Sequence, residues 1–187
     1  MPKQAQESGG EFLGTKQLLA LAEDDAVVLA YRVRKMQDFT STVSEKSVAQ
    51  VLAHMLVLSP EERAGELWLD QGLINGGITS KLVKESDGTA IGGRMEKMKT
   101  GANFWPALNP PKARDWKLIE KVYDNFGLDP KADDADEKLF ALLRNRVGEG
   151  GGSGERVDLS GKGNGTVLDR AQARQQAARA GDDEPPF

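Results

Sequence analysis

Residues 89–108 read TAIGGRMEKMKTGANFWPAL, a pattern typical of two β-strands joined by a short turn. The predicted strands cover residues 89–98 and 104–108, and the polar, Gly-containing segment 99–103 is the turn between them. The second strand is aromatic and follows a lysine-rich turn. This hairpin predicts a mainly β fold.

Three further strands are predicted upstream, at residues 27–36, 47–58 and 66–69. In the first of them apolar residues give way to alternation, so that Tyr31 shares a face with Val33 and Arg32 shares the other face with Arg34. A polar turn at 38–44 follows this strand. The chain therefore supplies five strands before residue 109.

A helix is expected at residues 71–83, although Gly72, Gly76 and Gly77 weaken that prediction. Three strands, a helix and two strands is the order of a five-stranded OB-fold barrel. Another small barrel and an α+β sheet are the alternative folds. Two helices are expected afterwards, at 114–126, with Gly127 as its cap, and at 134–147.

Composition changes sharply after residue 148, where a Gly-rich run begins. Residues 155–181 hold few large apolar side chains to offset the entropy lost on ordering. We expect a disordered leader at 1–14, an OB-fold domain at 15–127 and a C-terminal helix at 128–148. The remaining residues, 149–187, are expected to form a disordered tail with an acidic interaction tip.

The charge is divided unevenly, although the whole chain carries a net charge of −4. Residues 27–123 hold 14 Lys and Arg against 11 Asp and Glu, which leaves a mildly basic centre between acidic flanks. The chain has no Cys and one His, which excludes thiolate and His-cluster metal sites, and no nucleophile motif is present. We therefore expect a non-enzymatic cytoplasmic protein without cofactor, metal or membrane span.

The last seven residues are GDDEPPF. A partner could hold the ring and carboxylate of Phe187 in a pocket while its basic groups meet the acidic side chains, and prolines reduce the ordering cost. The expected partner-binding residues are Asp182, Asp183, Glu184, Pro185, Pro186 and Phe187. This tip resembles the C-terminal end of bacterial and phage single-stranded DNA-binding proteins. Glu184 and Pro185 depart from the usual sequence of that end.

Residues 91–108, within a broader likeness over 26–125, are similar to OB-fold single-stranded DNA-binding proteins of bacteriophages and actinobacteria. The resemblance lies in a Gly-Arg strand, a Lys- and Gly-containing turn and an aromatic strand before a helix. It implies DNA binding in replication, recombination and repair, in the bacterial host cytoplasm if the protein is phage-encoded. It also implies that helicase, polymerase, primase or recombinase partners bind the tip.

Single-strand binding requires cations for the phosphates and flat side chains for the bases. The expected DNA-binding residues are Arg32, Arg34, Lys35, Lys81, Arg94, Lys97, Lys99 and Trp105, with Lys84 as a further cation. The aromatic candidates are Tyr31, Phe39, Trp68, Phe104 and Trp105. Trp105 is expected to stack on bases, Phe104 to fill the core because it points the opposite way, and Tyr31 to be buried. His54 is interpreted as structural.

Three other functions are left open by the sequence. An OB-like protein-interaction module or phage structural protein would not bind nucleic acid. An enzyme would need an active site built from carboxylates, and an RNA chaperone would prefer RNA. The oligomeric state, including a homo-oligomer, is also left open.

Overall fold

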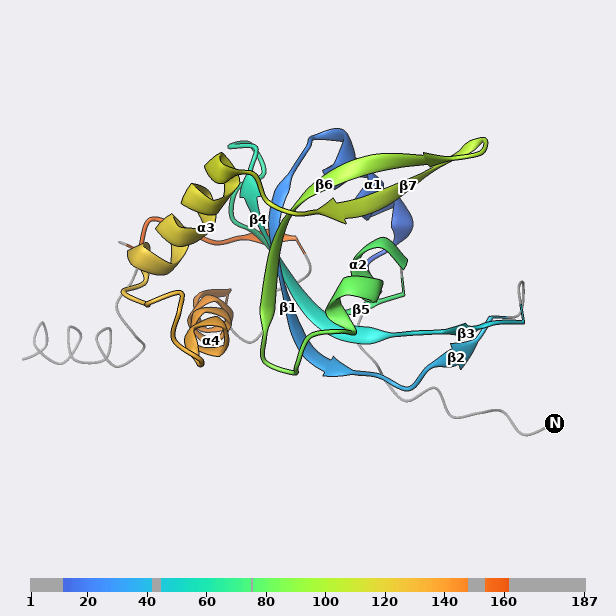
Figure 1. The fold of residues 1–187 in the computed structure, drawn as a ribbon. Helices are drawn as coiled ribbons and strands as arrows, with labels where there is room; N and C mark the ends of the chain where they lie inside the picture. The colour runs from blue at the N-terminus through green and yellow to red at the C-terminus, as the bar shows by residue number, and fades with distance from the viewer. Residues whose placement is uncertain (1–11, 42–44, 75, 148–153, 162–187) are drawn as a thin grey trace, which may run out of the picture.

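A six-stranded antiparallel sheet organises the part of the chain that the computed structural model describes, residues 12–41, 45–74, 76–147 and 154–161. Its strand order is β7-β6-β1-β4-β5-β8, and every neighbouring pair is antiparallel (Figure 1). The strands are β1 (Val27–Lys35), β4 (Val51–Ser59), β5 (Glu66–Leu73), β6 (Ala90–Thr100), β7 (Asn103–Asn109) and β8 (Glu155–Arg156). A separate two-stranded ladder pairs β2 (Phe39–Thr40) with β3 (Ser47–Val48).

The mainly β class is confirmed, whereas the closed five-stranded barrel is not, because the sheet is open. A barrel closes only when its two edge strands pair. Here the free edge of β5 is taken by other segments: β8 pairs with Glu66 and Leu67, and Phe12 bridges Gly72. The described part of the chain therefore leaves β7 without a second neighbouring strand.

Helices cover both faces of the sheet. On one face, α1 (Thr15–Glu23) and α2 (Gly76–Leu82) pack against side chains such as Val28 and Met55. On the other, α3 (Ala113–Asn125) and α4 (Ala135–Val147) pack against alternate residues of the same strands, such as Leu29 and Leu56. Because successive strand side chains point to opposite faces, β1 is buried on both sides for most of its length.

Sequence signals placed the helices well. Gly127, with φ of +68°, lies just after the helix α3, where a left-handed residue ends a helix at little cost. Helix α4 has acids in its first turn and Arg144 and Arg146 in its last, as the helix dipole favours. The helix expected at 71–83 is shorter, because residues 71–73 continue β5, and the strand expected at 47–58 is divided into β3 and β4.

The expected tail boundary at residue 149 is wrong for residues 154–161, which belong to the fold. Strand β8 pairs with β5, and Val157 is buried in the core beneath α3. Asn125 Nδ2 also donates to the carbonyl oxygen of Leu159 at 2.7 Å. One buried valine and a few backbone hydrogen bonds anchor a segment whose average composition predicts disorder. Residues 162–187, with the acidic tip, lie outside the described residues.

Two ribbons extend from the sheet toward the same side of the molecule, and α2 lies between them (Figure 1). One ribbon is the β6–β7 hairpin. The other begins where the pairing of β1 with β6 ends, at Tyr31. Beyond that point β1 stays paired with β4 as far as Lys35, and the two strands continue into β2 and β3. We call them the β6–β7 hairpin and the β2–β3 arm.

Candidate nucleic-acid interface

The outer half of the β6–β7 hairpin exposes large apolar side chains. Met98 lies opposite Trp105, and Lys99 lies opposite Phe104. Directly opposed residues share a face of an antiparallel pair, so each face of the ribbon carries one aromatic ring. Trp105 is 45% exposed and Phe104 is 51% exposed. The expectation that Phe104 fills the core is therefore wrong, whereas stacking by Trp105 stays a prediction.

The register along the hairpin explains this exposure. Met95 and Leu108 form an opposed pair that is buried in the core near α1 and α2. Two residues beyond the Met95–Leu108 pair, toward the turn, Lys97 forms an ion pair with Glu23, the last residue of α1. The Lys97 ammonium also lies 5.7 Å from the centroid of the Phe104 ring. Lys97 is thus exposed but already paired with a carboxylate.

Arg32, expected on the DNA-binding surface, is buried and structural instead. Its Nε donates to Asp87 Oδ1 at 2.7 Å, and its Nη1 donates to the carbonyl oxygens of Leu82, at 3.1 Å, and Val83, at 3.0 Å. The Glu85 carbonyl oxygen accepts a further bond from the same nitrogen. These bonds fix the segment after α2 to β1, and because the side chain is also buried, Arg32 leaves the candidate interface.

Arg94 is a second correction. Its guanidinium forms two hydrogen bonds with the carboxylate of Asp115, whose side chain is 1% exposed, and it donates to the Asp25 carbonyl oxygen at 2.9 Å. A paired, buried arginine holds α3 and the start of β1 against β6. It cannot meet a phosphate without breaking that ion pair, so it also leaves the candidate interface.

Some of the remaining predicted cations have a hydrogen-bond or ion-pair partner, and others have none among the described residues. Lys81 Nζ donates to the carbonyl oxygen of Leu108 and is half-buried. Lys35 lies 3.9 Å from Asp38 in an exposed pair, which contributes little. Arg34 and Lys99 are exposed, and the structure shows no ion pair between either of them and a described residue. Of the predicted cations, Arg34, Lys35 and Lys99 therefore remain accessible to a phosphate, as does Lys84.

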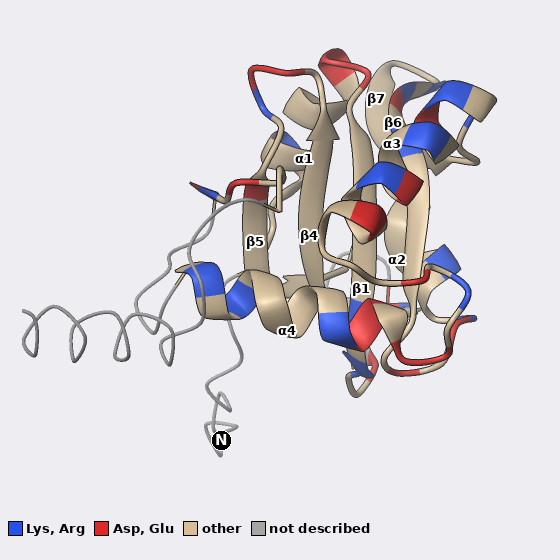
Figure 2. Cartoon of the chain, turned by 90° about the vertical axis from the view of Figure 1, so that its left-hand side faces the viewer, with Lys and Arg blue, Asp and Glu red and all other residues tan. Residues whose placement is uncertain are grey.

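One more exposed cation joins them on the same side of the molecule, Lys46 at the start of β3, and Lys84 follows α2. The hairpin, α2 and the β2–β3 arm thus each present positive charge where Figure 1 shows the two ribbons. On the opposite side, basic and acidic segments alternate on α3 and α4 (Figure 2). Asp38, Glu45 and Asp87 are also exposed on these segments, so the side with the ribbons carries both signs of charge beside its exposed rings.

The outer face of β1, β4 and β5 is covered by α4. Tyr31 stacks on Phe140 of α4, with ring centroids 4.8 Å apart, and on His54, at 5.5 Å. Tyr31 is buried, as expected, and Trp68 is buried in the other core. The side chain of Phe39 lies outside what the structure describes. None of the rings on this covered face can reach a ligand while α4 is in place.

His54 has a structural environment that makes folding stability depend on pH. Its Nδ1 accepts a hydrogen bond from the Asp70 backbone N–H at 2.9 Å, and Arg144 lies 3.3 Å from Nε2. Burial lowers the pKa of His54 to about 4, with help from Arg144 and against the carboxylate of Asp70.

A lowered histidine pKa means that the unfolded chain binds the proton more readily, so stability is lost as pH falls from about 6.5 toward about 4. We expect wild type to lose about 2 kcal/mol more than a His54→Gln variant between pH 7 and pH 5. Urea unfolding at both pH values measures the difference. Parallel pH profiles for the two proteins would contradict the assignment.

Two contributors were missed or undervalued at the level of sequence. Met98 becomes a partner of Trp105 through the hairpin register, which a centred turn at residues 101–102 could have revealed. Lys46 joins the interface through the β2–β3 ladder, which carries no strong sequence signal because each strand has two residues. Phe104 was wrongly predicted to fill the core, because strand alternation indicates which face a side chain is on but not whether another element covers that face.

Within the described ranges, no group of three or more His, Asp or Glu side chains is placed to hold a metal ion, and no helix is long and apolar enough to cross a membrane. Comparison with protein-family models, with curated proteins and with solved structures gives no match.

Proposed function

We propose that this protein binds single-stranded DNA without strong sequence preference and protects unpaired strands in replication, recombination and repair. The observation that carries the proposal is the β6–β7 hairpin, which exposes Phe104 and Lys99 on one face and Trp105 on the other. Aromatic rings that accept stacked bases next to cations that follow phosphates are the two elements of sequence-tolerant single-strand binding.

The path of the strand follows from what α4 covers. OB-folds bind oligonucleotides on the face of their second and third strands and on the loops after the first and fourth. With β1, β4, β5, β6 and β7 as the five strands of an OB-like sheet, α4 covers that face. The two loops correspond to the β2–β3 arm and the β6–β7 hairpin. We therefore assign DNA binding to these ribbons and to Lys84, which follows α2 between them.

The acidic Phe-ended tip is proposed to recruit partner proteins such as a helicase, polymerase, primase or recombinase. Its residues, 182–187, are separated from the fold by the 20 residues 162–181 of the sequence, which we propose let it reach a partner away from the DNA path. In this division of roles the tip contributes no DNA contact. Its removal should abolish partner binding and leave DNA affinity equal or higher.

Titration of a labelled oligo-dT at several salt concentrations tests the proposal. Five exposed cations, Arg34, Lys35, Lys46, Lys84 and Lys99, would displace counterions, so the logarithm of the association constant should fall with the logarithm of salt with a slope of about −3.5. Full-length protein and a chain ending at residue 181 should give similar slopes. Failure to bind oligo-dT at low salt would refute the proposal.

The exposed Met98, Phe104 and Trp105 also favour a second candidate, a protein-interaction module that uses the hairpin as an apolar contact. The lysines decide between the two functions. If the hairpin binds a protein, replacing Lys99 and Lys84 by alanine should change the affinity for that protein little. If it binds DNA, the same replacements should lower the affinity for DNA. Parallel titration with oligo-U distinguishes a preference for RNA.

A further inference from the structure

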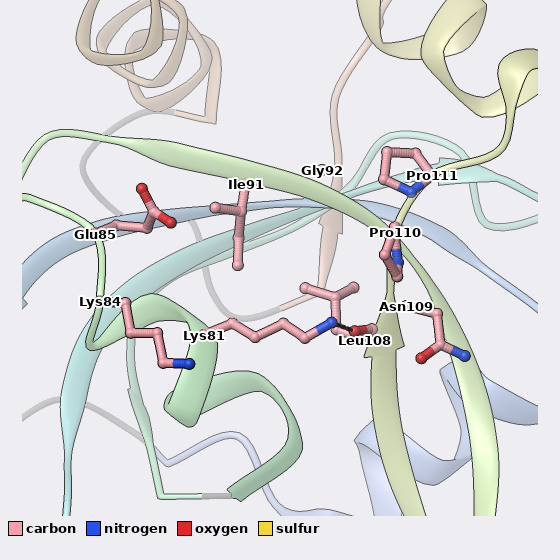
Figure 3. Close-up of a pocket in the computed structure, with 9 residues that line it drawn as sticks. All are labelled: Lys81, Lys84, Glu85, Ile91, Gly92, Leu108, Asn109, Pro110 and Pro111. Atoms are coloured by element: carbon pink, nitrogen blue, oxygen red, sulfur yellow. Dashed lines mark hydrogen bonds between the residues drawn. The ribbon is translucent and has the colours of Figure 1, made fainter.

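An open pocket of about 280 Å³ lies between α2, β6 and the segment that follows β7 (Figure 3). It is separate from the hairpin tip, since neither Trp105 nor Lys99 lines it. Strand β7 links the two places: Asn109 is four residues beyond Trp105, roughly 13 Å at the rise of a β-strand. The lining residues are Lys81, Lys84, Glu85, Ile91, Gly92, Leu108, Asn109, Pro110 and Pro111.

The walls of this pocket are mostly apolar and rigid. Ile91 and Leu108 form one part, and the rings of Pro110 and Pro111 form another (Figure 3). Pockets for drug-sized ligands begin at about 300 Å³ and enclose most of the ligand. An open site just below that size suits one flat ring that enters from a larger molecule.

Lys84 and Asn109 offer a cation and an acceptor to a ligand in the pocket, which the Glu85 carboxylate also lines. Lys84 is exposed, and the structure shows no ion pair between it and a described residue. Asn109 Nδ2 donates to Glu96 Oε2 at 2.7 Å, which fixes the amide and leaves its Oδ1 as an acceptor. A ring with an N–H group and a nearby negative charge would satisfy both groups, and a nucleotide carries this combination.

The pocket is held in shape by buried contacts. Arg32 fixes the end of α2, including the backbone of Glu85, to β1. On the other side β6 and β7 approach so closely that a Cβ at Gly93 would lie 2.5 Å from a Leu108 methyl group and 2.7 Å from the Asn109 carbonyl oxygen. A site whose walls are fixed before binding loses little entropy when it is occupied.

We infer that this pocket holds one nucleotide of the bound strand, with its base against Ile91 and the two prolines and its phosphate on Lys84. The inference rests on the proposed function, because the pocket lies between the hairpin and the β2–β3 arm. A free nucleoside triphosphate fits less well, since Lys84 is the one cation here without a partner among the described residues. Single-strand binding supplies one phosphate for each base.

The experiment uses the full chain, an oligo-dT probe and two pocket variants. Lys84→Ala should reduce the salt slope by about 0.7, the share of one phosphate contact. Asn109→Ala should weaken binding about three- to ten-fold at fixed salt, as expected for one lost hydrogen bond. Lys117→Ala, an exposed lysine on α3 with no ion pair to a described residue, is the matched control and should change neither quantity.

Asn109→Ala also removes the bond to Glu96, so amide chemical shifts of the unaltered protein provide an independent measurement. Addition of oligo-dT should move the signals of Lys84, Ile91 and Asn109 together with that of Trp105. If oligo-dT binds and shifts Trp105 while the pocket signals and both variants match the Lys117→Ala control, the pocket inference is wrong and the proposed function stands. If oligo-dT does not bind, both fail.

Discussion

Replacing Trp105 by alanine is expected to weaken oligo-dT binding by roughly ten- to a hundredfold, the largest functional effect of any single substitution in this chain. The indole is 45% exposed on a ribbon that leaves the core, so its removal creates no cavity. A stacked base contributes about 1–3 kcal/mol by alanine substitution. Fluorescence anisotropy of a labelled oligo-dT measures the loss.

Trp116→Ala provides the matched control. Trp116 is 49% exposed, on α3, where positive and negative charges alternate. Its removal should leave DNA affinity unchanged. Quenching gives a second readout: a Trp105→Phe protein should lose most of the fluorescence quenching by DNA, and a Trp116→Phe protein should keep it. Equal effects of the two alanine substitutions would contradict the assigned interface.

Removing one partner of the Arg94–Asp115 pair is expected to have the largest effect on stability. Either Arg94→Ala or Asp115→Ala should lower the free energy of unfolding by about 3–5 kcal/mol, because the remaining charge is left buried without its partner. Burial raises the pKa of Asp115, but the hydrogen bonds from Arg94 and the Lys112 N–H and the charge of Arg94 outweigh it, so the pKa is lowered. This stabilisation is present above the usual carboxyl pKa and is lost as pH falls below it.

Arg114→Ala is the control for this pair. Arg114 is next to Asp115 in sequence and its Nε lies 3.7 Å from the same carboxylate, but its side chain is 72% exposed. Exposed pairs contribute at most about 1 kcal/mol, so this variant should unfold close to wild type in urea. If Arg94→Ala unfolds like Arg114→Ala, the buried pair does not hold α3 against the sheet.

Whether a cation predicted from the sequence stays exposed depends on the acceptors that lie around it in the fold. Arg32 and Arg34 look equivalent in an alternating strand, yet the structure buries the first against the carbonyl oxygens after α2 and exposes the second. Likewise Arg94 and Lys99 occupy one strand, and only Arg94 meets a carboxylate from α3. Whether a cation is buried or exposed depends on acceptors that are distant in the sequence. Strand alternation gives no information about them.

By itself the sequence determined the approximate limits of five of the elements. Alternation of apolar residues, Gly and Pro positions and helix-end charges act within a few residues, so β1, β6, β7, α3 and α4 were placed close to their observed limits. Only the tertiary structure decided that the sheet stays open, that residues 154–161 join it and that α4 covers its outer face. These outcomes depend on which distant segments compete for one strand edge or one apolar face. That competition is settled by packing in three dimensions.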